Sequence, residues 1–230
     1  TARSWAMPLG LMAVALQLYG RWLTATGLAL LSFLLHPLLG IWPLVLIVAD
    51  RIPLSRLLPL VILPALVVLF IGSQGGLDFP RLHLISGALL TYVKNANDIL
   101  FKPEGSRLPL HILPLLILLL ASRIGSPSLH PMYKRLVLIA VGALMLALIA
   151  SYQYPVEIVV QGQPWRVTWL TYPISALAIL DILQTLHRKS PVRIAVPWLC
   201  AVLLALTTLG VVAMPWALVG LGALALAISF

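Results

Sequence analysis

The chain has 230 residues, of which 61% are hydrophobic and 9% are charged, and its formal net charge is +9. Soluble domains carry roughly 25% charged residues, so this composition excludes a soluble globular domain, and its hydrophobicity excludes a disordered chain. It predicts an all-α, polytopic membrane protein. The positive charge then indicates cytoplasmic loops and anionic membrane lipids, and not nucleic acid.

Apolar blocks broken by prolines make up the first part of the chain. Residues 5–19 form a short apolar block, and residues 22–49 contain no charged side chain. The His36-Pro37 pair interrupts the second block, because proline lacks a backbone N–H and clashes with the preceding turn. This pattern predicts either one kinked helix or two short helices that meet at His36-Pro37. Residues 57–71 are the next predicted span.

Residues 72–107 form the one long stretch that is too polar for a bilayer, and three of the six carboxylates lie in it: Asp78, Asp98 and Glu104. Within it, residues 81–94 repeat apolar side chains at the spacing of one helical face. The segment is too short to span, so we expect a helix that lies in the membrane interface. Residues 95–107 contain Pro103 and Gly105 and predict a loop.

The rest of the chain predicts further spans, at residues 108–121, 136–154, 170–186, 194–213 and 216–230. Residues 156–169 are β-branched and alternating at their ends, and they predict either a small hairpin or the entry to the next helix. In total we expect about seven or eight membrane segments in a single transmembrane domain over residues 1–230. The start at Thr1 and the end at Phe230 inside an apolar run lead us to expect a longer parent chain.

Basic residues gather in three loops, at residues 51–56, 123–135 and 187–193. An even number of predicted spans separates these loops, so the positive-inside rule places all three in the cytoplasm and predicts a multi-pass protein of the cytoplasmic (inner) membrane. The same topology turns residues 72–107 and 154–166 outward, and it turns His36-Pro37 outward as well if residues 22–49 are two half-spans. We expect these three elements to border one water-facing cavity at the outer leaflet.

Asp98 and His36 are the candidate catalytic residues. A carboxylate can act as a general base or bind a divalent metal, and a histidine within an apolar run must face a cavity or a bundle interior. The alternatives are a solvated loop carboxylate and a histidine that bonds a backbone carbonyl freed by Pro37. The spacing of acids and histidines matches no metal motif, so no metal site and no cofactor is identified, and a divalent metal stays open.

Arg166, together with Gln163, Trp165 and Arg81, forms the candidate substrate-binding set. An arginine at the membrane edge can clamp a phosphate through two hydrogen bonds, and aromatic neighbours suit a sugar or a lipid carrier. The alternative is an interfacial aromatic belt with a snorkelling arginine. No P-loop or hydrolase motif occurs, which argues against nucleotide-driven transport within this chain.

The helix break at His36-Pro37, the outward segment with Asp98, and the string Gln163-Pro164-Trp165-Arg166 resemble the C-terminal membrane half of bacterial polytopic glycosyltransferases of the GT-C type. The resemblance implies a polyprenyl-phosphate or other lipid-linked sugar as substrate, at the outer face of the membrane. The catalytic acid of that family typically lies in the first outward loop, where this sequence has an apolar block, so no catalytic residue is carried over.

Two other functions fit the same pattern. Broken helices around a cavity are typical of secondary transporters. A non-catalytic subunit that packs against other membrane subunits in a larger assembly is the second alternative.

Overall fold

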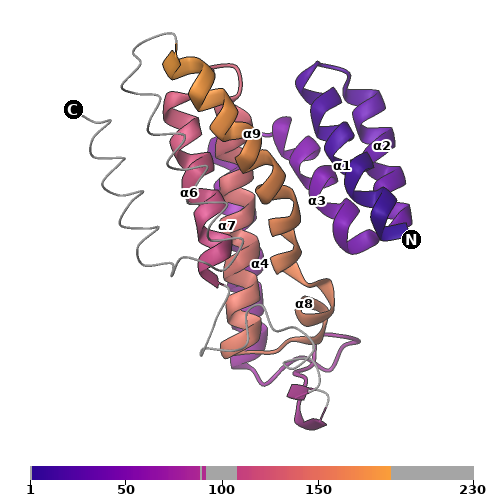
Figure 1. Cartoon of the computed structure of the whole chain (residues 1–230). Coiled ribbons are helices and arrows are strands. Elements are labelled where there is room, and N and C mark those ends of the chain that lie inside the picture. Colours follow the sequence, from indigo (N-terminus) through magenta and orange to yellow (C-terminus); the bar gives the residue numbers. More distant parts are fainter. Residues whose placement is uncertain (1, 89, 92–107, 188–230) are drawn as a thin grey trace, which may run out of the picture. The chain divides into compact units, whose positions relative to one another are not determined.

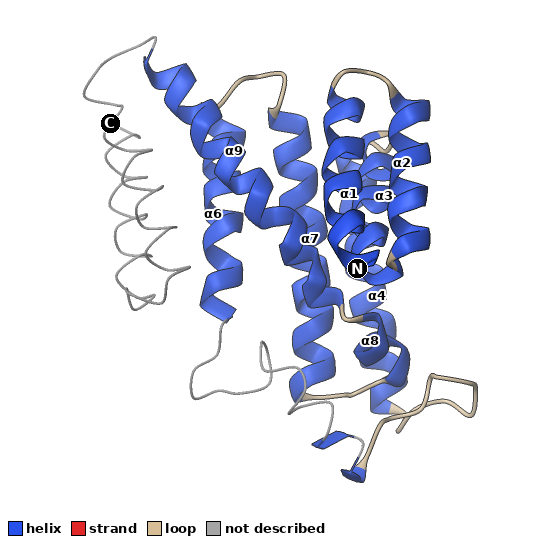
Figure 2. Cartoon of the chain, turned by 45° about the vertical axis from the view of Figure 1, so that its right-hand side comes forward, coloured by secondary structure: helices blue, strands red, loops and turns tan. Residues whose placement is uncertain are grey.

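The computed structural model describes residues 2–88, 90, 91 and 108–187, and every named element in these ranges is a helix (Figures 1 and 2). The predicted all-α class is therefore confirmed for the described part of the chain. The elements in order are α1 (Ala2–Leu18), α2 (Trp22–Leu35), α3 (Pro37–Asp50), α4 (Leu54–Ser73), α6 (Leu108–Ile124), α7 (His130–Tyr152), α8 (Glu157–Gly162), the 3-10 helix η1 (Pro164–Val167) and α9 (Thr168–His187).

Among the described residues, three helical segments are long and apolar enough to cross a membrane: Leu54–Ser73, His130–Tyr152 and Glu157–Leu186. The 20 residues of α4 correspond to about 30 Å, the thickness of a bilayer core. The helices α2 and α3 have 14 residues each, or about 21 Å, so neither reaches across alone. The predicted spans at 194–213 and 216–230 lie outside the described residues.

The chain divides into two compact units. The first unit contains Thr1–Ser106 and Leu138–Leu170, and the second contains Arg107–Val137 and Thr171–Phe230.

In the first unit, α1, α2 and α3 pack closely because small residues lie at their contacts. Ala13, Ala25 and Ala29 are fully buried and form a core cluster with Ile47. A Cβ atom at Gly40 would overlap the Phe33 backbone, so only glycine allows α2 and α3 to approach so closely there.

His36 separates α2 from α3, which selects two short helices over one kinked helix. Its backbone is extended, with φ −156° and ψ 92°, as expected for a residue before proline. The His36 carbonyl accepts hydrogen bonds from the Leu39 and Gly40 amides at 3.0 and 2.9 Å, and these bonds start the new helix.

The two ends of the α1–α3 bundle differ in charge. Gln17 Nε2 donates to Asp50 Oδ2 at 2.7 Å, and the Arg51 guanidinium lies 5.1 Å from the centre of the Trp22 ring. The end of α1, the start of α2 and the end of α3 therefore meet, and we call this the Arg51 end. The opposite end, where α2 meets α3, is the His36 end.

Residues 81–85 differ from the predicted interfacial helix. Arg81 has φ +65°, outside the helical region. The Ile85 amide donates to the Pro155 carbonyl at 2.9 Å, and the Glu157 amide donates to the His83 carbonyl at 3.1 Å. These backbone partners pull the segment into an extended conformation. Within the predicted range, helical backbone is described only at residues 87, 88, 90 and 91.

Residues 156–169 form the entry to α9 and not a hairpin. Val156 and Val160 are 0% and 3% exposed, whereas Ile158 is 49% exposed. Buried side chains four residues apart favour a helical turn, and α8 covers this stretch. Gln163 then takes a left-handed backbone with φ +45° and turns the chain into η1.

Candidate functional site

Residues 154–169 are the centre of the His36 end, because three other parts of the first unit contact them. The extended residues 81–85 pair with residues 155–158. At the end of α4, a Cβ atom on Gly72 would overlap the Tyr154 ring, so helix and ring are in direct contact. The start of α3 contacts the same residues through a hydrogen bond to Trp169. The described parts of the three predicted outward elements thus lie at one end of this unit.

The bond between Trp169 and α3 is explained by a proline. Trp169 Nε1 donates to the Leu39 carbonyl at 3.1 Å. In an α-helix this carbonyl would accept from the residue four positions later, which is Pro43 and has no N–H. The indole replaces the missing donor, which is how neighbouring helices make internal prolines tolerable in a membrane. His36 lies three residues before Leu39, and Arg166 lies three residues before Trp169.

Glu157 holds a polar cluster at the surface of this end. His83 Nε2 lies 2.8 Å from Glu157 Oε2, with side chains 60% and 17% exposed. Gln161 Nε2 donates to Glu157 Oε1 at 2.5 Å. The sequence could not predict this pairing, because His83 approaches Glu157 only when residues 81–85 are extended.

Arg166 and its expected companions occupy different environments. Arg166 is half-buried, and its Nε donates to Gln163 Oε1. Trp165 is 3% exposed, so its ring packs in the protein interior, whereas the substrate-binding hypothesis needs it at the surface. Arg81 is exposed, and its carbonyl accepts from the Ile158 amide at 3.0 Å.

Of the two candidate catalytic residues, only His36 lies in the described part of the chain. His36 is half-buried, and its Nδ1 is shielded from solvent with no hydrogen-bond partner among the described residues. Asp98 lies outside the described residues. Over the described ranges, no group of three or more His, Cys, Asp or Glu side chains is arranged to hold a metal ion.

A second polar cluster lies in the second unit, around Asp181. This carboxylate is 8% exposed and accepts hydrogen bonds from the Ser126 amide at 3.0 Å and the Tyr133 hydroxyl at 3.2 Å. The Ser126 hydroxyl also donates to it. Its partners in the described part of the chain are neutral donors. Asp181 therefore fixes the loop between α6 and α7.

Comparison with known proteins adds no assignment: no protein-family model, no curated protein and no solved structure matches the chain.

Proposed function

We propose that this chain is a multi-pass protein of the cytoplasmic membrane that handles a lipid-linked substrate at its His36 end. The expected substrate class is a polyprenyl-phosphate-linked sugar, and the expected reaction is glycosyl transfer. The observation that supports this proposal is the gathering of α3, residues 72–85 and residues 154–169 at that end, through the Trp169, Tyr154 and Glu157 contacts.

The proposed topology has about seven or eight membrane segments, with the Arg51 end in the cytoplasm. Three arginines at the Arg51 end support it: Arg21 and Arg51 lie in its two loops, and Arg56 lies in the first turn of α4. Asp50 is the sole acid of the first 77 residues. An even number of proposed spans separates the basic loops at 123–135 and 187–193 from residues 51–56, so these loops lie on the same, cytoplasmic side.

Cysteine accessibility tests this orientation. In a Cys200→Ser background, we expect Ser73→Cys to react with a membrane-impermeant maleimide on intact cells. Ser55→Cys, which is also exposed, should react only after permeabilisation. The reverse pattern would refute the topology and, with it, the outward site.

In the proposed site, Arg166 contacts the carrier phosphate and Gln163 positions it. A guanidinium already held by a neighbouring amide loses less side-chain freedom when it binds an anion. Asp98 and His36 stay the candidates for a general base at the acceptor hydroxyl.

Photolabelling of the full chain in nanodiscs with a photoreactive polyprenyl phosphate tests the binding step. Hydrogen bonds to charged groups contribute about 1.5–3 kcal/mol, so Arg166→Gln should lower labelling at least tenfold. Arg21→Gln removes an exposed cation at the other end and should leave labelling unchanged. Equal labelling of Arg166→Gln and wild type would exclude Arg166 as the phosphate contact.

The second candidate is a non-catalytic subunit of a larger membrane assembly. The burial of Trp165 favours it, because a buried ring cannot stack on a sugar. Transfer of labelled sugar from polyprenyl phosphate by the purified chain, lost in Asp98→Asn, would support the enzyme. Binding of the carrier without any transfer would support the subunit. Secondary transport rests on the helix break at His36-Pro37 alone.

A further inference from the structure

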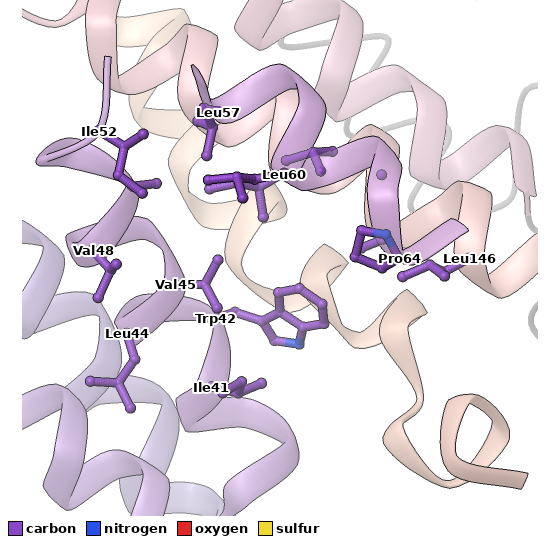
Figure 3. A pocket seen from close by; sticks show the side chains of 15 residues that line it. Ile41, Trp42, Leu44, Val45, Val48, Ile52, Leu57, Leu60, Pro64 and Leu146 are labelled. Atoms are coloured by element: carbon purple, nitrogen blue, oxygen red, sulfur yellow. The ribbon is translucent and has the colours of Figure 1, made fainter. Parts of the chain in front are cut away.

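An apolar groove runs between α3, α4 and α7 within the first unit. Its volume is about 420 Å³, and apolar residues of all three helices line it, including Trp42, Val45 and Val48 of α3, Leu60 and Pro64 of α4 and Leu146 of α7 (Figure 3). Specific small-molecule sites typically measure roughly 300–1,000 Å³. The groove is therefore large enough to hold part of a ligand and offers it almost purely apolar walls.

In the proposed topology the groove lies at the depth of the hydrocarbon chains. Both α4 and α7 are long and apolar enough to cross a bilayer. Along α3 the lining runs from Ile41 to Ala49, about 12 Å, which is within one leaflet of a core roughly 30 Å thick. Val48 of α3 and Leu60 of α4 both line it and are 59% and 51% exposed (Figure 3). An empty groove here would forfeit dispersion contacts that a single lipid chain can supply.

Two arginines are sequence neighbours of the residues that line one end of the groove. Ile52 and Leu57 line that end, and their sequence neighbours are Arg51 and Arg56. Arg51 is also stacked on Trp22, and Asp50, the one acid nearby, accepts a hydrogen bond from Gln17. The N–H groups in the first turn of α4 add partial positive charge, and no side-chain cap at Pro53 pairs with them.

We propose that this groove binds one acyl chain of an anionic phospholipid, with the phosphate held at Arg51 and Arg56. A zwitterionic lipid would supply the same chain but would place an ammonium group beside the two arginines. Anionic headgroups are the lipid groups that basic pockets between membrane helices bind on the cytoplasmic side. The chemistry therefore selects the anionic lipid.

This site is separate from the proposed substrate site, because its charged end is the Arg51 end and the substrate site is at the His36 end. The two proposals fail independently. Arg166→Gln should leave phospholipid retention unchanged, and Arg56→Gln should leave polyprenyl-phosphate labelling unchanged.

Native mass spectrometry tests the proposal on the full chain, released from nanodiscs that contain equal amounts of phosphatidylglycerol and phosphatidylcholine with the same acyl chains. We expect one retained phosphatidylglycerol, preferred at least fivefold. Arg56→Gln should lower that preference about fivefold, the factor that one surface cation contributes, whereas Arg123→Gln, an exposed arginine outside the groove, should not. Equal retention of the two lipids, or retention of neither, would overturn the proposal.

A bulky side chain placed in the groove distinguishes an acyl chain bound there from lipid bound elsewhere on the protein. Leu60→Trp should abolish retention, while Leu66→Trp, at a position on α4 that is 55% exposed and outside the groove lining, should retain the lipid. Equal retention by both variants would overturn the proposal.

Fluorescence quenching tests the same proposal without a bulky substitution, and it therefore still applies if Leu60→Trp does not fold. Phosphatidylglycerol with brominated acyl chains should quench wild-type tryptophan fluorescence more strongly than that of Trp42→Phe, because bromine quenches at short range. Equal fractional quenching would show that no chain lies beside Trp42.

Discussion

Trp169→Phe is the sharpest test of how this bundle tolerates its prolines. The substitution keeps an aromatic ring but removes the N–H that lies 3.1 Å from the Leu39 carbonyl. A buried acceptor left unsatisfied costs about 1–3 kcal/mol in proteins, and interhelical hydrogen bonds in membranes contribute about 0.6–1.7 kcal/mol. We therefore expect Trp169→Phe to lower the free energy of unfolding by about 1–2 kcal/mol.

Pro43→Ala provides the decisive comparison, because alanine restores a backbone N–H that can donate to the same carbonyl. In that background Trp169→Phe should cost about 1 kcal/mol less than in the wild type. The free energies come from reversible unfolding of the full chain in mixed micelles with increasing dodecyl sulfate.

Pro8→Ala is the matched control, since Pro8 lies inside α1 and has no link to Leu39. Its effect and that of Trp169→Phe should add, as they do for independent sites. A coupling between Trp169 and Pro43 below about 0.3 kcal/mol would refute the explanation that the indole replaces the missing donor.

The same unfolding assay checks three further substitutions. Gly72→Ala should lower the free energy of unfolding by about 1–3 kcal/mol, because its methyl group overlaps the Tyr154 ring. Gly27→Ala, where nothing lies within 4 Å, should raise it by about 0.5–1 kcal/mol. Equal effects of the two substitutions would contradict this packing. Asp181→Leu should cost about 2–3 kcal/mol, since it leaves buried donors unpaired, and a neutral result would show that water reaches them. His83→Ala should cost at most about 1 kcal/mol, because its side chain is 60% exposed, and a larger loss would mean that the ion pair is shielded from solvent.

The sequence predicted which segments gather near the candidate site, but not how their side chains are arranged. Charge and parity predicted that His36-Pro37 and residues 154–166 belong to one end of the protein, and the first unit brings the described parts of them together. Neither the burial of Trp165 nor the pairing of His83 with Glu157 could be predicted, because both depend on neighbours that are distant in sequence. Asp98 lies outside the described residues, so its role stays a prediction.

The sequence by itself determined the helical fold of the described residues, the presence of apolar runs long enough to cross a membrane and the break at His36. These depend on local quantities: the length of apolar runs, the missing N–H of proline and the scarcity of charge. Only the tertiary structure decided that residues 81–85 are extended, because their hydrogen-bond partners at 155–158 outweigh an amphipathic pattern. It also decided that Trp169 satisfies Leu39, 130 residues away, and that an apolar groove opens between α3, α4 and α7. Such features arise from the packing of distant segments, which no local pattern encodes.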